Sequence, residues 1–255
     1  MKIIDILENT EEKLPTDPHK AFEYAYRYYN KTDERCYEAE PYIIKKARAA
    51  YYYAETVMKE RWEEAEPIIM TDPYYAYQYA RDVIKGRWPE AEKYIMMDPV
   101  AAFDYANDVI KGRWPEAEPI IMADPSYAYC YARDVIKGRW PEAEPIIMTD
   151  PLYAYYYAHD VIKGRWFETE PIIMTDTFAA SEYYKYIMIP SVLKTNPTSK
   201  QIFRLLMNIA KYCNGYEYKD EYDELIKQIF PDSSIMVDKW INYGNNQRGK
   251  KRGKK

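Results

Sequence analysis

Small and apolar side chains recur along residues 73–84 at the spacing that places them on one face of a helix. At about 100° per residue, the residues that share this face are Ala76, Tyr77, Tyr79, Ala80, Val83 and Ile84. Asp72 is a favourable N-cap, Pro73 suits the first helical position, and Gly86 is typical of the residue just past a helix end. The pattern therefore predicts an amphipathic helix between Asp72 and Gly86 that buries its alanine- and tyrosine-rich side.

A shorter second helix is expected after each glycine. Trp88 precedes Pro89, which suits a first helical turn, and the glutamates that follow lie where the helix dipole favours negative charge. Most copies carry another proline four residues later, as Pro119 follows Pro115. This second proline is expected to kink the helix or to split a short turn from its start. The tryptophan is expected to fill the seam between helices, and Arg87 and its equivalents to pair with nearby glutamates or helix carbonyls.

Both helices belong to a unit that recurs every 26 residues. The segment DVIKGRWPEAE occurs at 82–92, 108–118 and 134–144. Residues 46–71 fit the same frame with Lys46-Ala47 in place of Asp-Pro, and residues 17–45 fit it with three extra residues. Neither amphipathic helix can bury its apolar face alone, so the copies must stack. The sequence predicts an all-α fold: an α-solenoid of 26-residue two-helix repeats with helical N- and C-terminal caps.

The same frame gives the expected organisation of the chain. Residues 1–45 form an N-terminal helical cap and a degenerate repeat, residues 46–177 form the solenoid, and residues 178–244 form a C-terminal helical cap. Residues 245–255 hold six positive charges and no apolar side chain, which predicts a disordered basic tail. Since the whole chain has a net charge of −5, the rest of it carries −11.

Composition narrows the class of protein. Hydrophobic residues make up 47% and charged residues 30% of the 255 residues, as in globular chains. The three cysteines, Cys36, Cys130 and Cys213, stand far apart, and there are only two histidines. We therefore expect no structural zinc site, no disulfide scaffold and a reducing intracellular setting. The N-terminal apolar run is too short for a signal peptide or a membrane anchor.

The near-identical central copies can be aligned with one another, which shows where they differ. Counted from the aspartate that begins each unit, positions 3, 7 and 10 vary most and share an arc of the first helix opposite its buried side. In the four copies these positions hold Tyr74, Gln78 and Arg81; Val100, Asp104 and Asn107; Ser126, Cys130 and Arg133; and Leu152, Tyr156 and His159. Invariant lysines at position 14 lie in the same arc: Lys85, Lys111, Lys137 and Lys163.

Two interpretations of this arc stay open. In the first, the residues at these positions vary because nothing restrains the sequence of an exposed surface. Alternatively, the rows form an extended recognition surface, as in many solenoids. The tyrosine, leucine and valine substitutions favour a protein-binding face, because solvent alone would not favour them. By residue type, the expected anchors are Tyr74, Arg81, Arg133, Tyr156 and His159.

Other chemistry is less favoured by the sequence. A catalytic site needs one asymmetric constellation, whereas carboxylate pairs such as Glu90 and Glu92 recur in several copies, so we expect no enzyme. There is no nucleotide-binding loop or metal motif, and hence no expected cofactor or metal. The repeated Lys-Gly-Arg-Trp could stack on nucleic acid, but residues 72–175 carry a net charge of −6, the wrong sign for binding phosphate. The basic tail stays a weak candidate for nucleic-acid contact.

The sequence motif YA-x-DVIKGRWPEAEPIIM resembles short tandem repeats in proteins of large tailed bacteriophages and giant DNA viruses. This resemblance implies a viral or bacteriophage origin and carries no functional residues. In architecture the unit is similar to tetratricopeptide, Sel1-like and HEAT repeats, although it is shorter. We expect a non-enzymatic scaffold, in the host cytoplasm or the virion and without a membrane, that binds a host factor or a virion protein. Nucleic-acid binding through the tail and structural self-assembly are the alternatives.

Overall fold

The computed structural model describes residues 13–195, residue 201, residues 204–205 and residues 207–209. All regular structure in these residues is helical and none of them lies in a strand, which confirms the all-α repeat fold. The chain divides into two compact units, Met1–Ala123 and Asp124–Lys255. The predicted basic tail and most of the predicted C-terminal cap lie outside the described residues.

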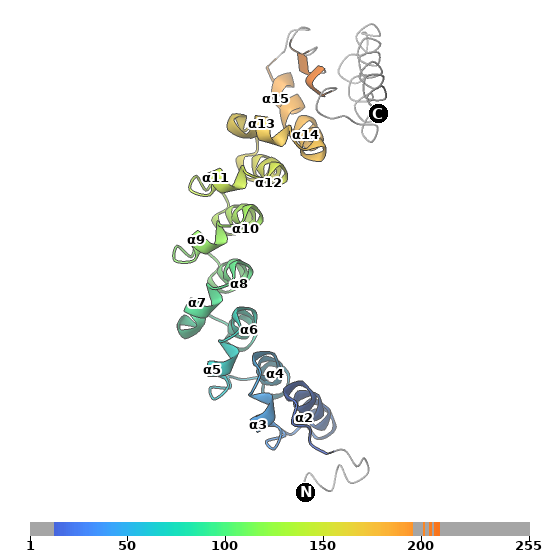
Figure 1. Ribbon diagram of the computed structural model, residues 1–255, viewed down its shortest axis with the longest axis vertical. Helices are drawn as coiled ribbons and strands as arrows, with labels where there is room; N and C mark the ends of the chain where they lie inside the picture. Colours follow the sequence, from blue (N-terminus) through green and yellow to red (C-terminus); the bar gives the residue numbers. More distant parts are fainter. Residues whose placement is uncertain (1–12, 196–200, 202–203, 206, 210–255) are drawn as a thin grey trace, which may run out of the picture. The chain divides into compact units, whose positions relative to one another are not determined.

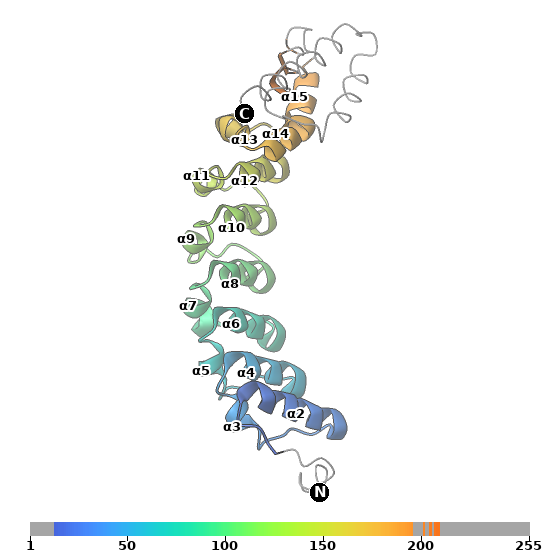
Figure 2. The same cartoon turned by 45° about the vertical axis from the view of Figure 1, so that its right-hand side comes forward.

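The first unit is a stack of helix pairs (Figure 1). Its elements are α2 (Pro18–Thr32), α3 (Glu40–Ile43), α4 (Ala47–Tyr53), η1 (Ala54–Met58), α5 (Glu66–Ile69), α6 (Pro73–Tyr79), η2 (Ala80–Ile84), α7 (Pro89–Ile95), α8 (Pro99–Asp104), η3 (Tyr105–Ile110) and α9 (Glu118–Ile121). The first helices of the repeats, α2, α4, α6 and α8, pack each against the next. The shorter second helices α5, α7 and α9 line one side of this stack (Figure 2).

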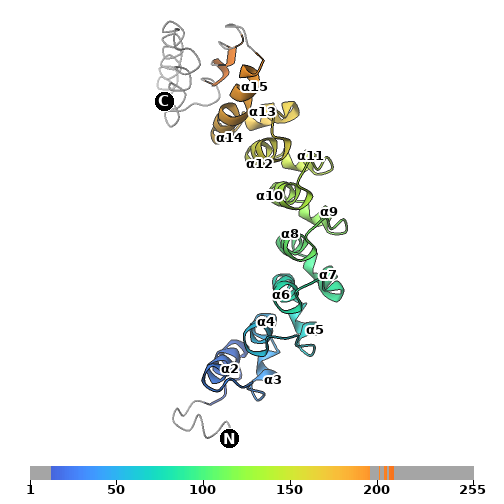
Figure 3. The ribbon, with the colours of Figure 1, turned by 180° about the vertical axis from the view of Figure 1, so that it is seen from behind.

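The second unit repeats the arrangement. Its elements are α10 (Pro125–Cys130), η4 (Tyr131–Ile136), α11 (Glu144–Ile147), α12 (Pro151–Tyr156), η5 (Tyr157–Ile162), η6 (Phe167–Thr169), α13 (Glu170–Ile173), α14 (Thr177–Tyr183), η7 (Tyr184–Met188) and α15 (Ile189–Leu193). Helices α10, α12 and α14 pack in succession, as Figure 3 shows from behind. In the last copy α15 follows η7 directly, because this copy lacks the Lys-Gly-Arg-Trp turn of the others.

The first helices begin at aspartate caps, as the sequence predicts. The side chain of Asp72 accepts hydrogen bonds from the backbone N–H groups of Tyr74 and Tyr75, at 3.1 and 3.3 Å. The copy that begins with Lys46 has no side-chain cap, yet α4 begins at the same position of the repeat. An aspartate cap of this kind contributes about 1 kcal/mol. The aspartate cap therefore adds stability to the helix, whereas packing between repeats determines where the helix begins.

The first helices end differently from the prediction. The last turn widens to a π-type turn, in which the backbone N–H groups of Lys85 and Gly86 both donate to the carbonyl of Ala80. This wider turn reverses the chain at the lysine, so Lys85, with φ 59°, is the left-handed residue. Gly86 was predicted to be the residue just past the helix end, but Lys85 has that place, and no described glycine has a positive φ. The equivalent lysines share the conformation: Lys59, Lys111, Lys137 and Lys163, with φ of 57, 58, 58 and 56°.

The second helices confirm the effect of the second proline. Where Pro119 is present, the helix α9 has only four residues and is preceded by a separate turn at 115–117. In the one central copy with Lys93 at that position, α7 runs unbroken for seven residues from Pro89. The two copies differ little elsewhere in this segment. Proline, which cannot donate the hydrogen bond of a helix interior, therefore explains the split.

Alanine and tyrosine fill the core of the first helices. Ala76, Tyr79 and Ala80 have no exposed surface and Tyr77 is almost completely buried, as predicted. Val83 and Ile84 are only half-buried, so that part of the predicted buried face is wrong. Both lie in η2, where the widened turn rotates them away from the face that α6 buries. The small alanines let neighbouring helices approach closely, which leaves the tyrosine rings to fill the space between repeats.

A hydrogen-bonded cluster, here called the tyrosine clamp, joins consecutive repeats. The buried backbone N–H of Trp88 donates to the hydroxyl of Tyr105 at 2.7 Å, and that hydroxyl donates to Oε1 of Glu92 at 3.0 Å. Arg87 holds the same carboxylate through two bonds of 2.8 and 2.9 Å, which confirms the predicted arginine–glutamate pairing. The tryptophan–tyrosine bond recurs with Tyr79, Tyr157 and Tyr183. Each of these tyrosines belongs to the repeat after the tryptophan it binds.

Candidate recognition surface

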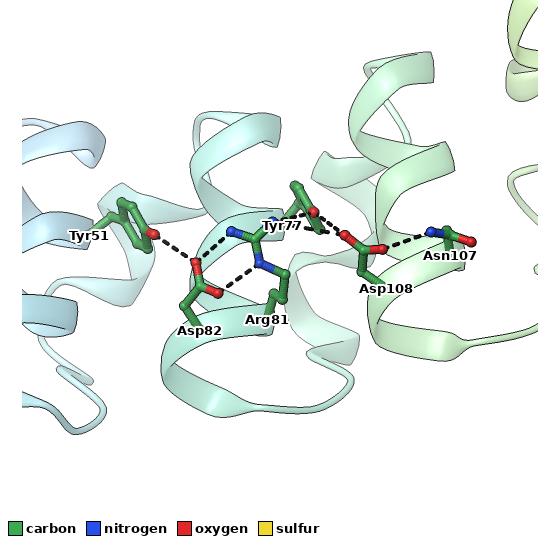
Figure 4. A network of polar contacts seen from close by, with 6 residues as sticks. All are labelled: Tyr51, Tyr77, Arg81, Asp82, Asn107 and Asp108. Carbon is green, nitrogen blue, oxygen red and sulfur yellow. Dashed lines mark hydrogen bonds and ion pairs between the residues drawn. The ribbon is translucent and has the colours of Figure 1, made fainter.

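A ladder of polar contacts crosses the exposed side of the first helices in the first unit (Figure 4). The hydroxyl of Tyr51 donates to Oδ2 of Asp82 at 2.7 Å, and the hydroxyl of Tyr77 donates to Oδ2 of Asp108 at 2.5 Å. Both pairs are separated by 31 residues, so each tyrosine reaches position 11 of the next repeat. This polar ladder fixes the offset between neighbouring first helices.

Arg81, one of the predicted anchors, is held inside this ladder. Its guanidinium donates to both carboxylate oxygens of Asp82, at 2.7 and 2.8 Å, and its Nη1 donates to the hydroxyl of Tyr77 at 2.6 Å. The same guanidinium lies 5.0 Å from the centre of the Tyr77 ring. Four contacts of this kind leave the side chain with little rotational freedom. Arg81 therefore presents a fixed, partly exposed cation.

The second unit contains the same ladder. The hydroxyl of Tyr129 donates to Oδ2 of Asp160. Arg133 donates to both carboxylate oxygens of Asp134 and, at 2.7 Å, to the hydroxyl of Tyr129. Its guanidinium lies 4.9 Å from the centre of that ring. The two predicted arginine anchors are thus equivalent in structure.

In the four copies with an aspartate at position 11, position 10 always holds a side chain that can donate a hydrogen bond. Asn107 donates from Nδ2 to Asp108 at 2.8 Å, and Nδ1 of His159 lies 2.6 Å from Oδ1 of Asp160. In the copy where Thr56 replaces the aspartate of position 11, position 10 is the acidic Glu55. The residue at position 10 thus follows the residue beside it, so variation at this position is restrained by a contact within the repeat.

The ladder also sets the protonation of its carboxylates. Burial by itself would raise the pKa of Asp82, but the hydrogen bonds from Arg81 and Tyr51 outweigh it and hold that pKa below the usual value. Asp160 behaves in the same way, with Tyr129 and His159 as its partners. For Asp104, burial and the neighbouring charge of Asp108 raise the pKa instead. Asp104 is therefore the one predicted surface residue whose negative charge the fold disfavours.

The other predicted surface residues differ in how far they reach solvent. At position 3, Tyr74 is 46% exposed and Val100 36%, whereas Ser126 and Leu152 are half-buried. The predicted residues at position 7 are all half-buried: Gln78, Asp104, Cys130 and Tyr156. The lysines at position 14 are all exposed: Lys85, Lys111, Lys137 and Lys163. Within the described residues, none of these four ammonium groups has a hydrogen-bond or ion-pair partner.

Aromatic rings gather on the same side of the second unit. The Tyr156 ring stacks on Tyr129, with centroids 5.7 Å apart, and contacts Tyr155 at 5.1 Å. From Tyr155 the contacts continue to His159 at 5.9 Å and from His159 to Tyr186 at 5.8 Å. Tyr186 is 48% exposed. Tyr129 and Tyr155 are buried, so Tyr156, His159 and Tyr186 are the rings of this cluster that solvent reaches. Aromatic side chains are among those that carry most binding energy at protein interfaces.

The residues that build the polar ladder were not predicted from the pattern of single helices. Tyr77 was assigned only to the buried face, and Asp82 and its equivalents were given no role. A signal was present: Tyr51, Tyr77 and Tyr129 each stand 31 residues before an aspartate, one repeat plus five residues. Such a spacing becomes informative only when it is known which helices stack.

Comparison of the chain with models of protein families, with curated proteins and with solved structures gives no match. In the part of the chain that the structure describes, no helix is long and apolar enough to cross a membrane. Nor do these residues contain three histidine, cysteine, aspartate or glutamate side chains grouped so that they could hold a metal ion. The arguments for a function therefore come from the surface of the repeats alone.

Proposed function

We propose that this protein is a non-enzymatic repeat scaffold that binds another protein through the exposed side of its first helices. The partner is a host factor or a virion component, in keeping with the viral or bacteriophage origin that the sequence of the repeat suggests. Binding uses the side chains at positions 3, 7 and 10 together with the lysines at position 14. Each repeat adds a few shallow contacts, and the affinity is their sum.

The main support for the proposal is that apolar and aromatic side chains are exposed next to arginines whose conformation is fixed by hydrogen bonds. In the first unit, Tyr74 and Val100 lie exposed at position 3, and Arg81 is fixed by Asp82 and Tyr77. Binding a preorganised side chain costs less conformational entropy than binding a free one. Tyrosine and arginine are also the residue types enriched at binding hot spots.

Affinity capture from a host-cell lysate, followed by mass spectrometry, tests the proposal. The wild type is compared with a variant in which five residues become alanine: Tyr74, Arg81, Arg133, Tyr156 and His159. A matched control replaces Glu90, Glu116 and Glu142 by alanine, since these glutamates are exposed on the second-helix side. We expect a partner that the wild type and the control capture and the five-residue variant loses. A partner that all three proteins retain would refute the proposed surface.

A second variant separates binding from folding, because arginine to alanine also removes ladder contacts. Tyr74→Ala and Val100→Ala change only exposed side chains at position 3. This double variant should unfold at the wild-type temperature and still bind the partner more weakly. Nucleic-acid binding through residues 245–255 and self-assembly stay predictions that no described contact favours.

A further inference from the structure

The turn that ends each first helix has an unusual backbone conformation at two consecutive residues, a lysine and the glycine after it. Lys85, Lys111, Lys137 and Lys163 occupy the left-handed region, which glycine adopts without strain and lysine does not. The next residue in each copy is a glycine, and it has an ordinary φ. A Cβ added to any of these glycines would meet no atom within 4 Å. The chain thus places lysine where glycine fits best and glycine where the fold does not require it.

The copy at residues 46–71 shows that the fold tolerates a side chain after the lysine. Glu60 stands there in place of glycine, and Lys59 keeps the left-handed conformation with φ 57°. The backbone N–H of Lys59 still donates to the carbonyl of Ala54, at 2.7 Å. The turn therefore does not require the glycine of the central copies. Asp33, with φ 58° at the end of α2, shows that a left-handed helix end does not require lysine either.

Near these turns, the arginines are paired with carboxylates, whereas the lysines are not. The neighbouring arginines are each held by two bonds to a glutamate, as Arg87 is by Glu92 and Arg139 by Glu144. Lys85 and its three equivalents have no such partner within the described residues. A glycine beside each lysine leaves the backbone open to the close approach of a ligand. Both features favour an anionic group that lies against the turn.

We infer that the Lys-Gly turns bind an extended acidic segment of a protein partner, with one carboxylate at each lysine. This inference rests on the proposed function and names the chemistry of the partner. Packed helices lie about 8–10 Å apart, and an extended chain advances about 3.3 Å per residue. An acidic residue at roughly every third position therefore matches consecutive turns within one unit. Residues 72–175 carry a net charge of −6, the wrong sign for a uniformly anionic polymer such as nucleic acid, whereas a segment with spaced carboxylates places its charge at the lysines.

Fluorescence anisotropy with synthetic peptides tests the spacing and the charge. The probe is a fluorescein-labelled peptide of repeated Glu-Ser-Gly triplets. One control peptide has glutamine in place of glutamate, and another has the same glutamates in a single block. The full chain should bind the spaced peptide more tightly than either control. Equal binding of the blocked peptide, or no binding of the spaced peptide, would overturn the inference.

The variants replace lysine by glycine at Lys85 and Lys111, which removes the charge and suits the left-handed backbone. Each replacement should weaken binding of the spaced peptide about two- to fivefold, the range for an exposed ion pair, while the protein stays folded. Gly86→Glu copies the residue found at Glu60 and should weaken binding without loss of stability. A third variant changes the basic residues of the tail to serine, and it should bind the peptide like the wild type in low salt.

Three outcomes distinguish this inference from the proposed function. If the lysine variants bind the peptide as the wild type does, the turns are not the binding site. If a partner from lysate is lost with the position 3 variant but retained by the lysine variants, the proposed function stands and the inference fails. If a single-stranded oligonucleotide binds more tightly than the spaced peptide and the lysine variants abolish that binding, the ligand is a nucleic acid and the acidic segment is ruled out.

Discussion

Removal of one hydroxyl group from the tyrosine clamp should destabilise the protein strongly. In Tyr105→Phe, the buried backbone N–H of Trp88 loses its acceptor and Glu92 loses a donor, while the ring keeps its packing against Trp114. An unsatisfied buried N–H costs about 1–3 kcal/mol, and a bond to a charged group contributes a similar amount. Since Arg87 still holds Glu92, we expect a loss of about 2–4 kcal/mol in the free energy of unfolding.

The same substitution at Tyr77 is the matched comparison. Its hydroxyl donates to Asp108, whose side chain is 36% exposed, so water can replace the lost bond. Phe103 occupies the equivalent position in the next copy, which shows that the repeat tolerates phenylalanine there. We expect Tyr77→Phe to cost at most about 1 kcal/mol. By contrast, the position of Tyr105 is tyrosine in every copy.

Urea unfolding followed by far-ultraviolet circular dichroism measures both losses under the same conditions. The midpoints and slopes are compared among the wild type and the two variants, because a change in slope would indicate that the repeats no longer unfold together. The account requires that Tyr105→Phe lower the stability clearly more than Tyr77→Phe. If the order is reversed, or if the two losses are equal, the clamp does not hold the repeats together as described.

Four further substitutions test other features of the repeat. Lys85→Gly should stabilise the protein by about 1 kcal/mol, because glycine adopts the left-handed backbone without strain; thermal unfolding checks this, and a lower unfolding temperature would contradict it. Asp104→Asn should stabilise the protein at neutral pH and Asp82→Asn should destabilise it, because the fold raises the pKa of Asp104 and lowers that of Asp82. The charge of Asp104 lowers the free energy of unfolding, and this effect disappears once the pH falls below the unfolded pKa of about 3.9. The charge of Asp82 raises the free energy of unfolding, and this effect is lost as the pH falls through its lower folded pKa. The stability differences between each variant and the wild type should therefore shrink towards about pH 3 in unfolding experiments. Lys93→Pro should shorten α7 to the four residues seen in α9, which backbone chemical shifts would detect, and an unchanged seven-residue helix would disprove the role of the proline.

The helices and the period were predictable because they depend on local chemistry. The Asp-Pro caps, the apolar periodicity and the second proline each act within one helix, and the structure confirms the caps, the effect of the proline and the buried face as far as Ala80. The helix ends were less predictable. The helix was expected to end at Gly86 on residue preference, whereas the widened turn reverses the chain at Lys85 and also exposes part of Val83 and Ile84.

The contacts of the candidate surface could not be predicted from one helix at a time. Arg81 and Arg133 were expected on the exposed side, but each also donates to a tyrosine hydroxyl that reaches the next repeat, and this contact depends on how the helices stack. The variation at position 10 therefore has a structural cause in addition to any role in binding. The Tyr74 ring contacts the rings of Tyr75 and Tyr77, but neither Tyr74 nor Val100 takes part in the hydrogen bonds of the polar ladder, which makes position 3 the more informative row.

Hydroxyl-radical footprinting of the protein with and without its captured partner tests the central claim most directly, because it reports the exposure of individual side chains. The account predicts that oxidation of Tyr74 and Val100 falls when the partner binds. Met97, which is 71% exposed and follows the second helix α7, should be oxidised to the same extent in both samples. Protection of Met97 with no change at Tyr74 would place the partner on another side of the repeats and contradict the account.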